Sequence, residues 1–348
     1  MPVYKLLTYE QNGMQSVGLL FGSCVYELTG TYKFLKEQAN QNLPPLPKQN
    51  PNMVDLLDEW DFYCDTLGLI VNGIEDTADQ IKNYKGICFI EQDINIKAPL
   101  LYPHKVLNAG ANYYKHNREM LVEAFNKEDR QPFFFYKGTK NVIIGQGDTI
   151  KLPRVSNYVD WECELAVVIG RRAKDVPASK ALEFIAGYTI MNDISARDKM
   201  VRPGELFFFD WFANKGNDTF APMGPYLVPK QFIPEPQNLG VQCLVNGELM
   251  QDSSTSDMIW TIDELIEYLS AVVTLEPGDV IATGTPHGVG MAKGLTADPG
   301  EFSKLAAHMY AGGGIFLKDG DYVTSKIEGI GILENPVIDL KIQSTSGS

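Results

Sequence analysis

The sequence predicts a mostly β protein with some α-helix (α+β), in which a small N-terminal domain precedes a larger one. Its 348 residues exceed the usual size of a single hydrophobic core, which favours two domains. Short β-prone runs separated by Gly and Pro outnumber the helical patterns along the chain. A β-rich larger domain with a few packed helices is the architecture that fits this pattern.

The first element is a small meander at residues 3–28. Its β-prone runs are VYKLLTY and VGLLFGSCVYEL, and turn signals fall at Asn12-Gly13 and Gly22-Ser23. A Pro-rich passage, QANQNLPPLPKQNPN, then leads to a helical stretch, MVDLLDEWDFYCDTLGLIV.

The segment INIKAPLLYP looks like a linker and sets the predicted domain boundary. It gives a small N-terminal β-rich domain at 1–100, a larger domain at 101–342 and a disordered tail, QSTSGS, at 343–348. Strand signals in the larger domain are FFFYKG, WECELAVVIG, FAPMGPYLV, GVQCLVNGEL, DVIATGTP and GDYVTSKIEGIG. Helical patterns are ASKALEFIAGY and TIDELIEYLSAVVT.

Composition excludes several classes of partner. The net charge of −14 and the lack of a basic run argue against nucleic acid, and no apolar run is long enough to cross a membrane. The start, MPVYKLLTYEQNG, lacks the features of a secretion signal, so a cytoplasmic protein is expected. The five scattered cysteines, without a CxxC pair, support neither a disulfide scaffold nor a thiolate zinc site.

Two acids stand at the start of the apolar run in YVDWECELAVVIG. Glu162 and Glu164 are two apart, so on a strand they share a face and repel each other unless a proton or a cation intervenes. Two solvated acids at a strand end fit this stretch equally well. Asp193 ends another apolar run and supplies a third carboxylate, and such a set suits Mg²⁺ or Mn²⁺. Zinc is disfavoured because the four histidines show no HxxxH or HxH spacing.

A second pair of chemically active residues lies in NAGANYYKHNREM. His116 and Glu119 are three apart, which places them on one face of a helix. A carboxylate beside an imidazole fixes its tautomer and raises its basicity, producing a base able to activate water. Taken alone, such a pair is more often found on the surface of a polar helix.

Several motifs together resemble the fumarylacetoacetate hydrolase superfamily. NYYKHNREM, WECELAVVIG, NDISARD, KGNDTFAPMGP and LEPGDVIATGTPHGVG follow in the order and at the separations typical of that family, as does LKDGDYVTSKIEGIGILENPV. The likeness runs from about residue 104 to 338, and within the family the sequence resembles acylpyruvase and 2-hydroxyhepta-2,4-diene-1,7-dioate isomerase members. It implies a catalytic domain built on a rolled β-sheet, a small N-terminal β-rich domain, and a homodimer.

The resemblance also implies roles for individual residues. The motif positions correspond to metal ligands Glu162, Glu164 and Asp193, catalytic residues His116, Glu119 and Lys215, and substrate-binding residues Lys137 and Thr285.

The implied enzyme is a Mg²⁺- or Mn²⁺-dependent hydrolase of the catabolism of aromatic compounds. It would cleave a C–C bond in a 2,4-dioxo acid of the acylpyruvate type through a metal-chelated enolate and an activated water. The alternative is an isomerase (keto–enol tautomerase) or a decarboxylase of a 2-oxo or 2-hydroxydienoate acid on the same metal site. The pair His116 and Glu119 favours hydrolysis, because tautomerisation needs no activated hydroxide. A non-catalytic metal clamp would need neither this pair nor Lys215.

Three segments remain open to two interpretations each. Residues 117–130 form a charged helix that is either a lid or a surface helix. The stretch at 291–314 is an insertion that lines the substrate pocket or covers a dimer contact, and its His308 touches substrate or belongs to a surface helix. An aromatic cluster shapes an apolar pocket or lies in the core; its members are Phe207, Phe208, Phe209, Trp211 and Phe212.

Overall fold

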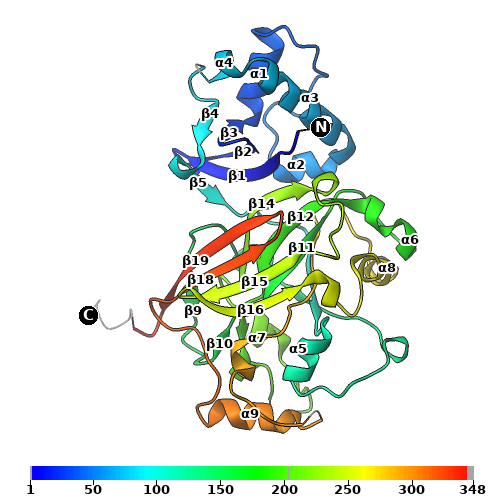
Figure 1. Ribbon diagram of the computed structural model, residues 1–348, viewed down its shortest axis with the longest axis vertical. Coiled ribbons are helices and arrows are strands. Elements are labelled where there is room, and N and C mark those ends of the chain that lie inside the picture. The colour runs from blue at the N-terminus through cyan, green and yellow to red at the C-terminus, as the bar shows by residue number, and fades with distance from the viewer. Residues whose placement is uncertain (1, 83, 203, 299, 343–348) are drawn as a thin grey trace.

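Two large β-sheets form the centre of the molecule, and helices lie around them (Figure 1). The computed structural model describes residues 2–82, 84–202, 204–298 and 300–342. The predicted tail at 343–348 therefore lies outside the described residues. The mixed α+β class is confirmed.

The predicted N-terminal meander is confirmed. Strands β1 (Lys5–Gln11), β2 (Met14–Phe21) and β3 (Cys24–Glu27) pair antiparallel in chain order. Asn12 and Gly13 form the first turn with φ of 52° and 76°, values that these two residue types tolerate best. The remaining strands of this part are β4 (Cys88–Ile90) and β5 (Asn95–Lys97).

Helices pack against the N-terminal strands, and one of them reaches the larger domain (Figure 1). They are α1 (Leu28–Glu37), α2 (Met53–Asp58), α3 (Trp60–Asp76) and α4 (Ala78–Ile81). The predicted helical stretch corresponds to α2 and α3, whereas α1 was not predicted. Its first turn holds Thr29, Gly30 and Thr31, which are poor helix formers, and the Glu27 carboxylate stabilises that turn by accepting from the backbone N–H groups of Thr29 and Gly30.

A twelve-stranded sheet joins the N-terminal strands to the larger domain. Its strand order is β4-β3-β2-β1-β14-β12-β11-β17-β6-β7, with β5 on β1 and β8 on β14. The junction is the pairing of β1 with β14 at Leu6 and Leu227. One apolar cluster contains side chains from both parts, so the division at residue 100 stays a prediction. The strands of the larger domain are β6 (Val106–Gly110), β7 (Phe133–Lys137), β8 (Ile143–Ile144), β11 (Cys163–Ile169), β12 (Ile185–Asn192), β14 (Ala221–Pro229) and β17 (Val280–Ala282).

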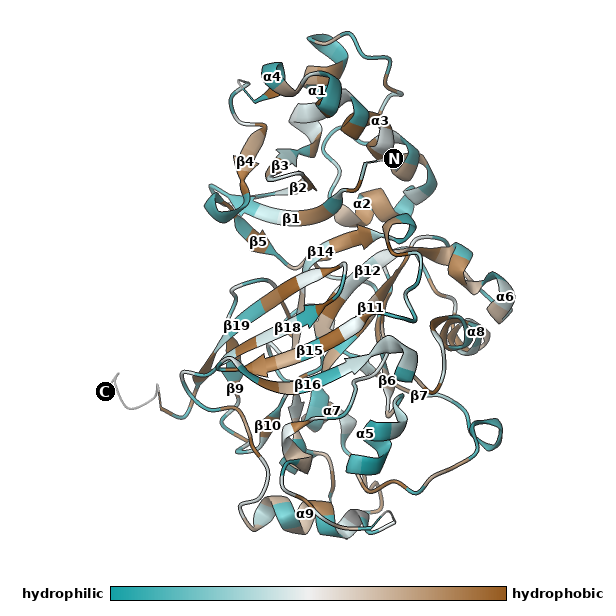
Figure 2. Cartoon of the chain, viewed as in Figure 1, coloured by the Kyte–Doolittle hydropathy of each residue, from teal (hydrophilic) through white to brown (hydrophobic). Residues whose placement is uncertain are grey.

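Both faces of this sheet are buried at its centre, where Figure 2 shows brown, apolar residues on β11 and β14. Along β11, Val167 belongs to one apolar cluster and its neighbour Val168 to the other. A five-stranded sheet covers the Val167 face, in the order β16-β15-β18-β19-β9. Its strands are β9 (Ile150–Leu152), β15 (Gly240–Val245), β16 (Glu248–Ser254), β18 (Tyr322–Ile327) and β19 (Gly331–Asp339). A short ribbon pairs β10 (Val159–Asp160) with β13 (Ser195–Ala196).

The predicted helix in TIDELIEYLSAVVT is confirmed as α8 (Ile262–Val272), which starts with a capping box between Thr261 and Glu264. The helix predicted over ASKALEFIAGY is wrong in its second half. After α6 (Ala178–Ala181) and a 3₁₀ turn, strand β12 begins at Ile185. This strand pairs with β11 on one side and with β14 on the other, and the pairing overrides the local helix propensity. The other helices are α5 (Tyr114–Glu119), α7 (Trp211–Lys215) and α9 (Phe302–Tyr310). Short 3₁₀ turns lie at Glu91–Asp93, Lys127–Asp129, Leu182–Phe184, Arg197–Lys199, Lys230–Phe232, Thr255–Asp257 and Gly290–Ala292.

None of the helices in the described ranges has both the length and the apolar character needed to cross a membrane. All five cysteines are free thiols, and Cys163 and Cys243 are buried core residues.

Candidate active site

Three buried carboxylates meet where β11 begins and β12 ends. The pairing of Cys163 with Asn192 brings these two strand ends together, so Asp193 lies beside Glu162, whose carbonyl accepts from the Asp193 N–H at 2.8 Å. One oxygen from each of Glu162, Glu164 and Asp193 lies within 4.8 Å of the others. Cys163 points the opposite way, into the apolar core, as strand alternation requires.

Three cations surround two of these carboxylates. The Lys215 ammonium donates to Glu162 Oε2 and to Asp193 Oδ2, both at 2.7 Å. Lys137 donates to Asp193 Oδ1 and to the carbonyl of Ile194, and Arg197 Nη2 lies 2.7 Å from Glu162 Oε1.

Glu164 differs from its two neighbours in having no ion-pair partner. It is 1% exposed, and across the described part of the chain its carboxylate accepts one backbone hydrogen bond, from Gly284 N–H at 2.8 Å, and forms no ion pair. A buried carboxylate without a cation, in a set that offers only oxygen ligands, fits a hard divalent ion such as Mg²⁺ or Mn²⁺.

The charges shift one another's pKa values. Burial raises the pKa of Glu164 well above its usual range, and Asp193 and Glu162 add to the effect. Burial acts the same way on Glu162, but Lys215 and Arg197 outweigh it and hold the pKa of Glu162 below its usual range. Burial lowers the pKa of Lys137 to about 8. Glu164, the carboxylate without a cation, therefore retains a proton more readily than Glu162.

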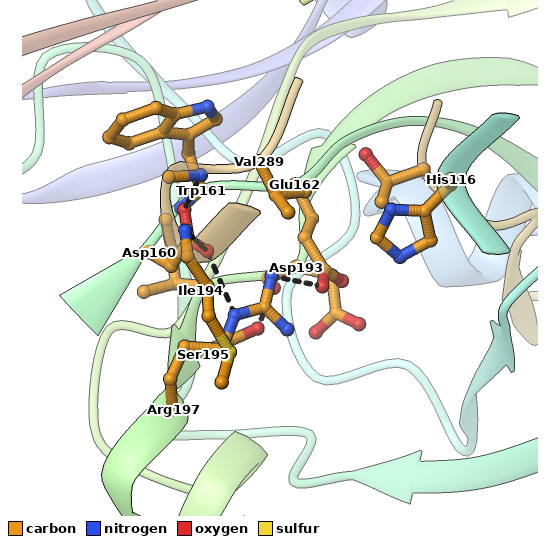
Figure 3. A network of polar contacts seen from close by, with 12 residues as sticks. His116, Asp160, Trp161, Glu162, Asp193, Ile194, Ser195, Arg197 and Val289 are labelled. Carbon is orange, nitrogen blue, oxygen red and sulfur yellow. Dashed lines mark hydrogen bonds and ion pairs between the residues drawn. The ribbon is translucent and has the colours of Figure 1, made fainter. Parts of the chain in front are cut away.

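Helix α5 brings an acid–base pair to the same place. The buried His116 places Nδ1 at 2.7 Å from Glu119 Oε1, and the other Glu119 oxygen accepts from Gly288 N–H at 2.8 Å. Because a carboxylate only accepts, Nδ1 carries the proton and Nε2 is left as a base. Figure 3 shows His116 beside Glu162 and Asp193.

Asp160 and Arg197 form a buried pair behind the carboxylates that sequence reasoning missed (Figure 3). Asp160 accepts from Arg197 Nε at 2.8 Å and from the backbone N–H groups of Trp161, Gly290 and Met291 at 2.7–3.0 Å. Arg197 extends from Asp160 to Glu162, so it fixes the position of that carboxylate. The alternation of acids in DWECE could have indicated Asp160, because residues two apart on a strand share a face and Asp160 is two residues before Glu162.

A cavity of about 520 Å³ opens over these groups. Its buried floor is made by Glu162, Glu164, Asp193, His116, Lys215 and Thr285. The Thr285 hydroxyl is oriented by Gln251, whose amide donates to it at 2.8 Å and also accepts from Cys163 N–H. Lys137 is not among the residues that line the cavity and reaches Asp193 from outside it.

Aromatic rings form one wall of the cavity. Trp211 stacks on Phe135 with centroids 5.0 Å apart, and Phe209 stacks on the same indole at 6.0 Å. The pocket interpretation therefore holds for Phe209 and Trp211. The core interpretation is wrong for Phe207 and Phe212, which are 82% and 84% exposed.

The helix predicted over residues 117–130 is wrong beyond Glu119. Leu121 has a φ of 58°, which ends α5, and only the 3₁₀ turn at Lys127–Asp129 follows. Val122 and Arg130 of this segment nevertheless line the cavity.

The insertion at 291–314 packs against the residues that follow α5 instead of lining the cavity. Its apolar side chains Met291, Leu305 and Met309 form a cluster with Met120, Leu121 and Val289. None of the described residues in this insertion lines the cavity, so the pocket-lining interpretation is wrong. The His308 ring lies 3.0 Å from the Lys293 carbonyl and not in the cavity, which favours the surface helix over a substrate contact.

Comparison with known proteins agrees with the geometry. Residues 105–338 match the family described as Fumarylacetoacetate (FAA) hydrolase C-terminal. The chain is 42% identical over 247 residues to oxaloacetate tautomerase FAHD2B, mitochondrial, of Bos taurus, which covers 71% of this chain and 70% of that protein.

Solved structures share nearly the whole fold. The 5-carboxymethyl-2-hydroxymuconate delta-isomerase of Mycobacterium smegmatis is 31% identical, with a TM-score of 0.64 over 96% of this chain and 98% of that one. A fumarylacetoacetate hydrolase from Exiguobacterium antarcticum is 27% identical, with a TM-score of 0.68 over 97% and 99% of the two chains. The resemblance predicted from the motifs is confirmed: the chain belongs to the fumarylacetoacetate hydrolase superfamily of enzymes.

Proposed function

We propose that the protein is a divalent-metal-dependent keto–enol tautomerase of a 2-oxo acid, with oxaloacetate as the first substrate to test. One observation carries the proposal: a buried carboxylate without a cation, Glu164, lies in the same cavity as the base His116. The 42% identity to an oxaloacetate tautomerase supports tautomerisation over the hydrolysis that the motifs alone favoured. The same imidazole that activates water also accepts a proton from carbon, so its presence does not require hydrolysis.

Glu162, Glu164 and Asp193 would hold the metal, because they are the three carboxylates that converge on one point. When bound, Mg²⁺ or Mn²⁺ would polarise the oxo group of the substrate and acidify the adjacent C–H bond.

The residues of the chain supply the proton transfer. His116 Nε2 takes a proton from the carbon next to the oxo group, and Glu119 stabilises the imidazolium that forms. The imidazolium then returns a proton to the oxygen, which completes the conversion of keto to enol. The ammonium of Lys215, fixed between Glu162 and Asp193, stabilises negative charge that develops on the oxygen.

Hydrolysis of a C–C bond in a 2,4-dioxo acid is the second candidate. The orientation of His116 by Glu119 favours it, since this pair is also what deprotonation of a water requires. The two reactions differ in their products, because only hydrolysis releases a second acid.

Product analysis of metal-stripped protein tests the proposal. Oxaloacetate and a small panel of 2,4-dioxo acids would be supplied with and without Mg²⁺ or Mn²⁺, and mass and tautomer would be followed together. Metal-restored conversion of oxaloacetate at unchanged mass supports the tautomerase. Release of pyruvate and an acid from the dioxo acids, without tautomerisation, would replace it with the hydrolase.

A further inference from the structure

The cavity changes in character from its floor to its mouth. The candidate metal ligands, His116 and Lys215 are buried, whereas Val122, Arg130 and Phe133 are exposed although they line the same cavity. Arg130 is therefore at the solvent side of the wall, and the carboxylates are at the closed end.

Arg130 also differs from the other cations of the wall. Among the described residues that line the cavity, arginine or lysine occurs as Arg130, Arg197 and Lys215. Arg197 is bound by Asp160 and Glu162, and Lys215 by Glu162 and Asp193. Arg130 forms no ion pair with any carboxylate in the part of the chain that the structure describes, so its charge is available to a ligand.

The arginine is held in place by its neighbours. Its guanidinium lies 5.5 Å from the centroid of the Phe125 ring, which stacks on Trp260 at 6.1 Å. The preceding Lys127 is paired with Glu264 of α8 at 2.6 Å, and its carbonyl accepts from the Arg130 N–H. The ring contact of the guanidinium and the backbone hydrogen bond of the same residue reduce the freedom that Arg130 would lose on binding.

We infer that Arg130 binds a second carboxylate of the substrate and so selects dicarboxylic over monocarboxylic 2-oxo acids. This inference rests on the proposed function, in which the first carboxylate and the oxo group occupy the metal end of the cavity. A planar guanidinium pairs with a carboxylate through two parallel hydrogen bonds. In a chain with a net charge of −14, an unpaired cation at the mouth also offsets the repulsion of a dianionic substrate.

The test compares acids of equal length with and without the second carboxylate. Turnover would be measured on oxaloacetate, and on 2-oxobutanoate as exchange of its C3 protons in deuterated water. Binding to the Mn²⁺-loaded protein would be measured by calorimetry on 2-oxoglutarate and 2-oxopentanoate. The variants are Arg130→Gln and Arg130→Lys, with Arg154→Gln as the control, because Arg154 is exposed and outside the cavity.

The expected result is a selective loss. Arg130→Gln raises KM for oxaloacetate and Kd for 2-oxoglutarate about 10- to 100-fold, leaves both monocarboxylic acids within about twofold, and leaves kcat nearly unchanged. Arg130→Lys restores part of the loss, and Arg154→Gln changes nothing.

Other results separate this inference from the proposed function. If Arg130→Gln changes the turnover of oxaloacetate no more than Arg154→Gln does, the role of Arg130 is overturned and the tautomerase proposal stands. The protein could instead bind 2-oxoglutarate selectively, lose that binding in Arg130→Gln, and tautomerise none of the acids. That result supports the role of Arg130 and overturns the proposed function. Equal loss for both acid classes, or no binding of either, overturns the inference.

Discussion

Replacing Asp160 with Asn is expected to destabilise the fold and weaken the metal site together. Each Asp160 oxygen accepts two hydrogen bonds: Oδ1 from Trp161 and Gly290, and Oδ2 from Met291 and Arg197. An amide nitrogen in either position faces two donors, so two hydrogen bonds are lost whichever way the side chain turns.

The magnitude follows from burial. Asp160 is fully buried, and a buried donor left unsatisfied costs about 1–3 kcal/mol, more when it is charged. Two such losses, together with the removal of the buried charge that pairs with Arg197 in either orientation, give about 3–5 kcal/mol. For a chain of 348 residues this corresponds to a fall of about 4–7 °C in Tm. Arg197 then has Glu162 as its remaining carboxylate partner and competes for it with a metal, so Mn²⁺ affinity should fall about tenfold.

The assay is thermal unfolding with and without Mn²⁺, together with calorimetric titration of Mn²⁺. Asp76→Asn is the control, because Asp76 is exposed at the end of α3 and should change stability by no more than about 0.5 kcal/mol. If Asp160→Asn unfolds at the same temperature as this control and binds Mn²⁺ as the unaltered protein does, the role given to Asp160 is refuted.

Four further predictions follow from the site and its surroundings. His116→Ala should lower kcat by about two to four orders of magnitude while Mn²⁺ affinity stays within about twofold; equal loss of both would remove the residue from proton transfer. Burial raises the pKa of Glu164, so at any pH below that pKa a binding metal ion must displace a proton from Glu164. Mn²⁺ affinity should therefore rise by up to about tenfold per pH unit and level off above the pKa. A Mn²⁺ affinity that does not change with pH, or a pH dependence that persists in Glu164→Gln, would exclude this linkage. Leu305→Ala should cost about 2–5 kcal/mol of unfolding free energy, because Leu305 is fully buried in a cluster with Met120 and Leu121; a Tm shift below about 1 °C would contradict it. The protein should be a homodimer by light scattering. If the exposed rings of Phe207 and Phe212 form the dimer contact, replacing both with Ser should yield monomers, whereas an unchanged dimer would place the contact elsewhere.

The sequence predicts the strands and the convergence of the three carboxylates because both depend on period-two alternation. Side chains two apart share a face, so the pattern around Glu162 and Glu164 specifies their geometry once the strand is recognised. Asp193 could be added because it ends the neighbouring apolar run, which became β12.

Features that depend on tertiary contacts could not be predicted in this way. Leu121 ends α5 with a positive φ that its residue type does not signal, and Ile185 enters a strand because it pairs with Ile169 of β11. The packing of Leu305 with Met120 and Leu121 joins segments about 180 residues apart in the chain, and no local pattern encodes such a contact.

The most direct test of the account is to follow the conversion of oxaloacetate between its tautomers while Mn²⁺ is added to metal-stripped protein. The account predicts no catalysis without metal, a rate that saturates at one Mn²⁺ per chain, and no saturable site in Asp193→Asn. Catalysis that persists in the stripped protein, or that is unaffected by Asp193→Asn, would contradict the assignment of these carboxylates to the metal.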